Sequence, residues 1–439
     1  MSFASTLASA KKSLKHTDVS HEHTSQLKNE KFKIHQEKHQ ESILEAKKTV
    51  NLVDTDEVAD YFYNSGIQMW YEHVKEYTFP CEFVDIGDEE RLELFFDFHK
   101  SLEVGGRDGY KMDRETKREH ELIFKNAGFD INIRENSSEK LKTLEDRITK
   151  VMSKMREDRN LDPKSSFYIK LSTRSPKDSK LVFKRAVEST KTKLQSLKNS
   201  GHQINENKKW SILNEEMRLA CQCWDGQDAV KILRDSERVG EDLKLILDRK
   251  YVKNFSRSLQ AGSEELLPDL PLCLVIRPFD QRITPSTEFR GFVWGGKLTC
   301  IGQYFYQLYF EGLADKKDKI SKDLQDFYNN KIRPKLFIPN DNNCFGYKTP
   351  SFMMDLVWID HNVGPILTEI NPFDGESLGT MKGSTGLFDF MDIDGDRQLL
   401  MGKRGDFVMR LVEKESENFI MENFSNLNVE WKEAINSIK

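Results

Sequence analysis

The stretch that decides the fold is SFMMDLVWIDHNVGPILTEINPF, residues 351–373. It contains two runs rich in apolar and β-branched side chains, residues 353–359 and 366–370, and each run predicts a strand. Four turn formers lie between the runs: Asp360, His361, Asn362 and Gly364. The stretch therefore predicts a β-hairpin.

One face of this hairpin is expected to be polar. If the turn is symmetric, Asp355 lies opposite Glu369, and because side chains alternate along a strand, Asn371 shares the face of Glu369. Two neighbouring carboxylates repel each other unless a positive charge lies on them. A divalent cation is one solution, since Mg²⁺ prefers oxygen ligands and is often held by carboxylates and substrate phosphates. A solvent-facing strand pair with an Arg or Lys partner is the other.

The composition predicts a soluble protein with one large composite domain or two domains. The chain has 439 residues, of which 32% are charged, and its mean hydropathy is −0.65, without a long uncharged apolar run. Residues 1–10 are too short and too polar for a signal peptide, so we expect a cytoplasmic protein with no membrane partner. The net charge of −5 gives no overall attraction to nucleic acid.

The cysteines fit a reducing compartment, because they are scattered through a large chain. They are Cys81, Cys221, Cys223, Cys273, Cys300 and Cys344. The pair at 221 and 223 has no second Cys or His pair at zinc-finger spacing, so a structural metal is not expected there.

Residues 1–52 are expected to form a flexible polar and basic arm. Up to about residue 49 the chain is rich in Lys, His, Glu, Gln and Ser and has few large apolar residues to bury. Its histidines keep no single helical face, which favours a solvated arm over a metal site. Aromatic and apolar residues at helical spacing in residues 56–79 place the start of the folded region at about residue 53.

Further helices and strands follow from periodicity and capping residues. Helices are predicted at residues 89–102, 138–155, 181–199, 215–223, 228–233 and 321–331, with Ser236 and Asp242 as caps. Strands are predicted at residues 83–86 and 272–276 and in a hairpin, 288–293 with 297–304, that turns at Gly295 and Gly296. On the first strand of that hairpin Glu288 and Arg290 share one face.

Residues 166–179, SFYIKLSTRSPKDS, combine a short apolar strand with a cationic loop. Lys170 lies in the middle of the strand, and the loop after it carries hydroxyls, cations and Pro176. Such a loop can bind phosphate through backbone N–H groups and side chains. An edge strand with a lysine that reaches solvent, followed by an ordinary polar turn, is the alternative.

Taken in order, these segments resemble the cell division cycle protein 123 family, assembly factors for the trimeric translation initiation factor two. The similar motifs are WYEHVKEYTF (70–79), FYIKLSTRSPKDS (167–179), LCLVIRPF (272–279), TEFRGFV (287–293), KLTCIGQYFYQLYF (297–310), MMDLVWID (353–360) and LTEINPF (367–373). Residues 228–247 match more loosely, and the resemblance covers roughly residues 61–390. The last motifs are specific in combination.

The resemblance implies a divergent ATP-grasp fold. Its class is α+β, with two lobes of mostly antiparallel sheets and flanking helices that hold ATP and Mg²⁺ between them. Residues 53–439 would form this composite domain, with an N-lobe to about residue 270 and a C-lobe from about residue 271.

The family's site residues carry over by position. Lys170 would meet the phosphates, and Arg277 and Arg290 would lie on the phosphate side. The segment that lines the adenine would be Leu274, Val275 and Ile276. The Mg²⁺ ligands would be Asp355, Glu369 and Asn371. Alternatively, the two arginines are structural and pair with Glu288 or Asp280.

The chain also departs from the family pattern. Glu369 stands where Asp is more common, and the Trp expected after the Lys-Leu pair is replaced by Thr173 and Arg174. Residues 373–387 form a longer stretch than usual, and the family's ending after it is reduced to residues 384–388. These differences could mark a paralogue with another client.

The resemblance implies an assembly factor that binds ATP and the γ subunit of initiation factor two, without a need for hydrolysis. The alternative is an ATP-grasp ligase, or an enzyme that adenylylates a protein or a nucleic-acid end. In that case Arg174, Lys177 and the Lys-rich helix after them would form an acceptor groove. A scaffold whose nucleotide site has decayed is a third possibility.

Overall fold

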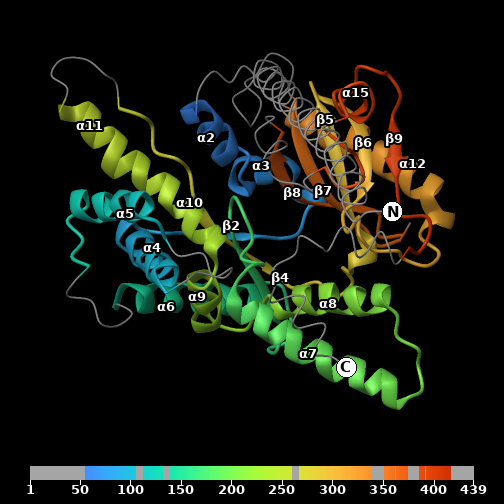
Figure 1. Ribbon diagram of the computed structural model, residues 1–439, viewed down its shortest axis with the longest axis horizontal. Coiled ribbons are helices and arrows are strands. Elements are labelled where there is room, and N and C mark those ends of the chain that lie inside the picture. Colours follow the sequence, from blue (N-terminus) through green and yellow to red (C-terminus); the bar gives the residue numbers. More distant parts are fainter. Residues whose placement is uncertain are drawn as a thin grey trace, which may run out of the picture.

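The computed structural model describes residues 55–104, 112–131, 139–259, 266–337, 351–360, 362–373, 385–390 and 392–416. The predicted arm at residues 1–52, His361, Cys344 and most of the 374–386 loop lie outside the described residues. The described part contains two β-sheets, each flanked by helices (Figure 1).

The first sheet has the strand order β1-β4-β2-β3, and all its neighbours are antiparallel. Its strands are β1 (Glu82–Asp85), β2 (Phe167–Leu171), β3 (Gln222–Cys223) and β4 (Cys273–Pro278). The helices that form its core are α4 (Asp88–Glu103), α6 (Glu139–Asp158), α7 (Lys180–Asn199), α8 (Glu206–Ala220), α9 (Gly226–Arg234) and α10 (Glu237–Asp248). The central strand β2 is buried along its whole length.

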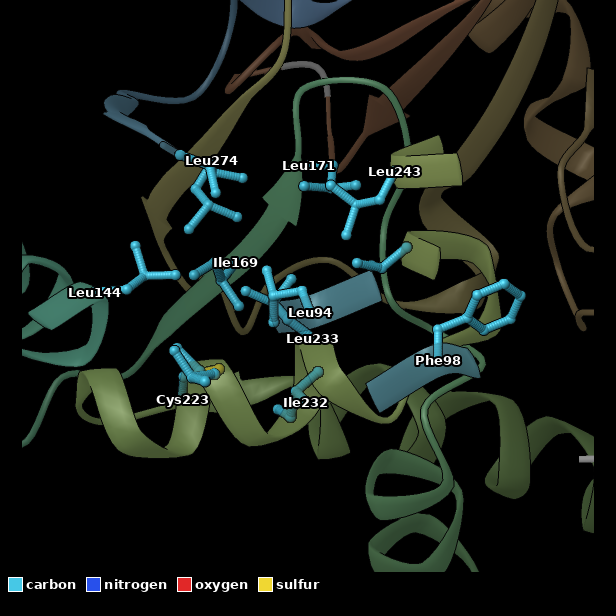
Figure 2. Packing of buried hydrophobic residues seen from close by; sticks show 14 of the residues in the cluster. Leu94, Phe98, Leu144, Ile169, Leu171, Cys223, Ile232, Leu233, Leu243 and Leu274 are labelled. Carbon is cyan, nitrogen blue, oxygen red and sulfur yellow. The ribbon is translucent and has the colours of Figure 1, made fainter. Parts of the chain in front are cut away.

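The core of this lobe lies between the sheet and its helices. Ile169 and Leu171 of β2 point toward leucines of α4, α9 and α10 (Figure 2). Helix α10 lies very close to α4 at Gly240. A Cβ atom added to Gly240 would lie only 2.0 Å from the ring of Phe98 in α4. Glycine is required at this crossing, and α10 is thereby fixed against the lobe.

The second sheet has the order β8-β7-β5-β6-β9 and is antiparallel except for β9, which runs parallel to β6. Its strands are β5 (Glu288–Trp294), β6 (Lys297–Gln303), β7 (Phe352–Trp358), β8 (Pro365–Pro372) and β9 (Val408–Arg410). The predicted turn at Gly295 and Gly296 is present, and both have positive φ, +54° and +76°. The hairpin predicted from residues 351–373 is β7 with β8.

Helices cover one face of this sheet, and segments near residue 400 pack on the other. The first group is α3 (Ile67–Val74), α12 (Lys317–Phe327), a π-helical turn (Tyr328–Ile332) and α13 (Arg333–Leu336). The second includes Phe388, Phe390 and α15 (Asp396–Leu400). The remaining longer helices are α2 (Thr55–Asn64), α5 (Arg114–Asn126) and α11 (Asn254–Leu259).

Two local predictions were wrong. Residues 221–223 are not helical, since α8 ends at Ala220 and a short strand follows. Asp242 is not a cap; it lies inside α10 with no exposed surface. Ser236, by contrast, is confirmed as the N-cap of α10, where its hydroxyl accepts a hydrogen bond from the Val239 amide.

The predicted α+β class is confirmed, because the structure has two mostly antiparallel sheets flanked by helices. The ATP-grasp relationship stays a prediction. The lobe boundary near residue 270 stays a prediction. The sheets interlock across it, since β4 after the boundary pairs within the first sheet and α3 near the start packs on the second. None of the described helices is long and apolar enough to cross a membrane.

Candidate functional site

A cavity of about 680 Å³ lies between the two sheets, a size typical of ligand sites. Strands β2 and β4 contribute to one wall, and β5, β6, β7 and β8 to the opposite one. Helix α8, the start of α10 and the loop after β2 complete it. Its cationic lining residues are Lys170, Lys177, Arg218, Arg238, Arg277 and Arg290. Its acidic ones are Asp178, Glu237, Asp280, Glu288, Asp355 and Glu369.

The β7–β8 hairpin places two carboxylates in the cavity. Asp355 is the direct cross-strand partner of Glu369, as predicted from the sequence. The register then shifts, so that Leu356 faces Leu367 and Thr368 is the extra residue of a β-bulge. The Thr368 hydroxyl donates a hydrogen bond to the Asp355 carbonyl at 3.0 Å, and both Thr368 and Glu369 line the cavity. Bulges of this kind redirect side chains at functional sites.

Each carboxylate is paired with a cation. Arg290 on β5 donates two hydrogen bonds to Asp355, at 2.7 and 2.9 Å. Lys170 on β2 pairs with Glu369 on β8, so this ion pair connects the first sheet to the second. Burial would raise the pKa of Glu369, but Lys170, together with Lys177 and Arg238, lowers that pKa to about 2. Glu369 is therefore ionised at neutral pH.

Four further cations that line the cavity have no carboxylate within 4 Å among the described residues: Lys177, Arg218, Arg238 and Arg277. Arg277 lies between the rings of Phe79 and Tyr168, 4.9 and 4.8 Å from their centroids. Lys177 lies 5.2 Å from the centroid of Tyr304. These two side chains can receive an anion without first losing an ionic partner.

Glu288 and Lys177 influence each other inside the cavity. Burial raises the pKa of Glu288, nearby Asp355 raises it further, and Lys177 opposes both. Burial would lower the pKa of Lys177, but Tyr304, Tyr168, Glu288 and Glu369 raise it instead. Lys177 is therefore a charged ammonium in a confined space.

The structure brings together five of the nine predicted site residues. Lys170, Arg277, Arg290, Asp355 and Glu369 all line the cavity. Asn371 does not line it; the residue is half-buried and lies opposite Met353, one step further along the same face of the hairpin. The other three, Leu274, Val275 and Ile276, have no exposed surface and belong to the hydrophobic cores.

The alternative in which Arg277 and Arg290 form structural ion pairs with Glu288 or Asp280 does not match the pairs observed. Arg290 pairs with Asp355 instead of Glu288 or Asp280, and Asp280 pairs with Arg282. The sequence placed Lys177 only in an acceptor groove of the alternative enzyme and not among the nucleotide-site residues, and it gave no indication of Arg218 or Arg238. Lys177 had a usable signal, because it lies in the cationic loop after Lys170. Arg218 lies in α8 and Arg238 in α10, and no local sequence pattern indicates where these helices pack relative to β2.

Among the described residues, no group of three His, Cys, Asp or Glu side chains lies close enough to hold a metal ion. Asp355 and Glu369 provide only two carboxylates, so a third ligand would come from an amide such as Asn371 or from the bound molecule. The donor set suits a hard cation that retains phosphate or water ligands. It fits Mg²⁺ bound together with a polyphosphate better than a metal held by protein alone.

The fold and the cavity define an α+β protein with a ligand-sized cavity between two mostly antiparallel sheets. The sequence model of the family described as D123 matches residues 208–432, more than half of the chain, so this chain belongs to the D123 family. This confirms the resemblance to the cell division cycle protein 123 family inferred from the motifs.

Other comparisons give more distant similarity. A Dictyostelium discoideum protein named translation initiation factor eIF2 assembly protein is 29% identical over 190 residues, which are 41% of this chain and 45% of that relative. The alignment thus spans less than half of the relative. Two structures of Cdc123 from Schizosaccharomyces pombe, one C-terminally truncated, are 17% identical with a TM-score of 0.43. They cover 81% of this chain, which in turn covers 98% and 97% of them.

Proposed function

We propose that this protein binds ATP with Mg²⁺ in the cavity between its sheets and promotes assembly of translation initiation factor two by contacting the γ subunit. The observation that carries the nucleotide part is the convergence of Lys170, Arg290, Asp355 and Glu369 in one cavity. The assembly part is supported by the name of the Dictyostelium relative and by membership of the D123 family.

The ion pairs suit a polyphosphate ligand. Without an anion, the cations neutralise the carboxylates of the hairpin. With Mg²⁺ and ATP, Lys170 and Arg290 would bind phosphate oxygens, and Asp355, Glu369 and Asn371 would hold the cation. Charge would remain balanced because a triphosphate and a divalent cation enter together. Lys177 and Arg277 would add positive charge on the phosphate side.

Binding between the lobes explains how a nucleotide can assist assembly without being consumed. A ligand that contacts both sheets binds only when they are correctly placed relative to each other, so it stabilises that arrangement. A partner surface formed in that arrangement is then present in a larger fraction of molecules. The proposal requires binding energy but no chemical step.

Calorimetric titration of Mg·ATP into the wild type and Asp355→Asn tests the nucleotide site. We expect saturable binding by the wild type and at least a tenfold loss in the variant, since Asp355 is both a proposed ligand and the partner of Arg290. Asp396→Asn is the matched control, because Asp396 forms a similar two-bond pair with Arg410 of the same sheet, outside the cavity. Equal affinity of all three proteins would refute the site.

Incubation with purified initiation-factor subunits separates the two classes of function. An assembly factor increases trimer formation in the presence of Mg·ATP and releases no ADP or AMP. Steady release of either product would favour the ligase or adenylylating enzyme instead. Failure to bind the isolated γ subunit would refute that partner without affecting the nucleotide site.

A further inference from the structure

The loop that carries Lys177 is fastened to helix α10 by a buried carboxylate outside the cavity. Asp242 in α10 has no exposed surface. One of its carboxylate oxygens accepts a hydrogen bond from the Thr173 hydroxyl at 2.5 Å. The other accepts from Arg174, whose Nε lies at 2.7 Å and whose terminal nitrogen binds the same oxygen.

The far end of the loop is held by the same helix. The carboxylate of Asp178 accepts hydrogen bonds from the Ser236 hydroxyl at 2.6 Å and from the Arg238 backbone amide at 2.9 Å, both at the start of α10. Between these two anchors lie Ser175 and Lys177, which both line the cavity. The part of the loop that faces the cavity is therefore held at both ends by α10, and the Asp242 anchor lies outside the cavity.

Helix α10 is a firm support for these contacts. Gly240 lets it approach Phe98 closely, and the Tyr63 hydroxyl donates to the Asp242 carbonyl at 2.5 Å. In this chain a hydroxyl and a guanidinium on one carboxylate hold the loop.

We propose that Asp242 is a positioning residue for nucleotide binding: through Thr173 and Arg174 it holds Ser175 and Lys177 at the phosphate side of the cavity. This inference rests on the proposed function, because it assumes that the cavity binds ATP. A side chain fixed before binding loses less conformational freedom when the ligand arrives. Releasing the loop should thus weaken binding of the phosphates and leave binding of the nucleoside unchanged.

The test compares Asp242→Asn with the wild type in two measurements. Calorimetry with Mg·ATP and with adenosine should show about a tenfold loss for Mg·ATP and no change for adenosine. Hydrogen exchange without ligand should show faster exchange of the backbone amides in residues 172–178. Asp97→Asn is the control, because Asp97 pairs with Arg234 of α9 and, within the described part of the chain, forms no hydrogen bond or ion pair with this loop.

Thr173→Val is a milder second variant, for the case that Asp242→Asn does not fold. Its control is Thr299→Val, because Thr299 is a buried, hydrogen-bonded threonine of the second sheet. Unchanged exchange of the loop in both Asp242→Asn and Thr173→Val would overturn the proposal. Equal weakening of Mg·ATP and adenosine would also overturn it, because that is the result of a general structural defect. A wild type that binds no Mg·ATP refutes the proposed function, whereas the exchange measurement still decides whether Asp242 holds the loop.

Discussion

At the scale of single residues, Lys170 and Glu369 form the only ion pair among the described residues in which a strand of the first sheet binds a strand of the second. Lys170 is almost fully buried and Glu369 is mostly buried, so each charge depends on the other. Removing either partner leaves a buried charge without compensation. The cost should appear as a loss of stability that depends on pH.

Glu369→Gln should destabilise the protein by about 3 kcal/mol at neutral pH, because Lys170 is left unpaired. The pKa of Glu369 is held at about 2, below its usual value, so its contribution exists above about pH 4.5 and is lost as the pH falls toward 2. Urea unfolding of wild type and variant should therefore differ most near pH 7 and converge on acidification. Glu413→Gln, in an exposed pair with Lys317, is the control. A constant difference at all pH values would contradict this prediction.

Lys177→Met should lower the affinity for Mg·ATP about tenfold while changing stability less than Lys170→Met does. The reason is that replacing Lys170 leaves Glu369 without its ionic partner. Replacing Lys177 leaves no such carboxylate, because none of the described residues has a carboxylate within 4 Å of Lys177. Calorimetry and urea unfolding measure the two effects separately. Lys177→Arg keeps the charge and should retain most of the affinity. A Lys177→Met protein with wild-type affinity would exclude Lys177 from the site.

The sequence predicted residues whose position follows from strand periodicity. Asp355 and Glu369 face each other because they lie symmetrically about a recognisable turn, and alternation predicted the common face of Glu288 and Arg290. The role of Asp242 could not be predicted in this way. Its partners, Thr173 and Arg174, are separated from it along the chain by the three helices α7, α8 and α9, so only the packed tertiary structure brings them together.

At the scale of elements, the crossing of α10 and α4 decides where the loop anchors lie. Periodicity predicted most helices well, since α6, α7 and α9 lie within a few residues of their expected bounds. It failed at residues 221–223, where pairing with β2 imposes strand geometry on a segment with a helical pattern. Local propensity is weak enough to be overridden by such tertiary contacts.

Gly240→Ala should destabilise the protein by about 2 kcal/mol, although alanine is the better helix former. The reason is that the new Cβ would meet the Phe98 ring at 2.0 Å. Combining it with Phe98→Ala should cost less than the sum of the two single changes, because the clash is relieved. Urea unfolding of the single and double variants measures this coupling. Ser256→Ala, on the exposed side of α11, is the control for helix propensity. Additive losses would show that the contact is not the cause.

At the scale of the whole molecule, the cavity is formed by segments from both sheets, and a ligand there should stabilise the whole fold. Mg·ATP at a hundredfold excess over its dissociation constant should add about 2.7 kcal/mol to the free energy of unfolding. Asp355→Asn should gain much less at the same concentration. Thermal or urea unfolding with and without Mg·ATP measures the gain. No stabilisation of the wild type at saturation would contradict binding between the lobes.

The arrangement of the two sheets was predictable from the sequence only through the family resemblance. Each strand carries a local pattern, but nothing in residues 82–85 or 167–171 indicates that β4 lies between them in the sheet. Strand order depends on contacts between residues far apart in the chain, for which a single sequence carries no periodic signal. The family resemblance predicted two lobes with mostly antiparallel sheets, but not the order of the strands within them.

The position of β4 also sets the order of events during synthesis. Strands β1 and β2 do not pair with each other; both pair with β4. When β2 leaves the ribosome, β4 lies about 100 residues further along the message. At about 5 to 20 residues per second, β1 and β2 wait roughly 5 to 20 seconds for their shared neighbour. During that interval the backbone N–H and C=O groups that will pair with β4 are open to pairing with other chains.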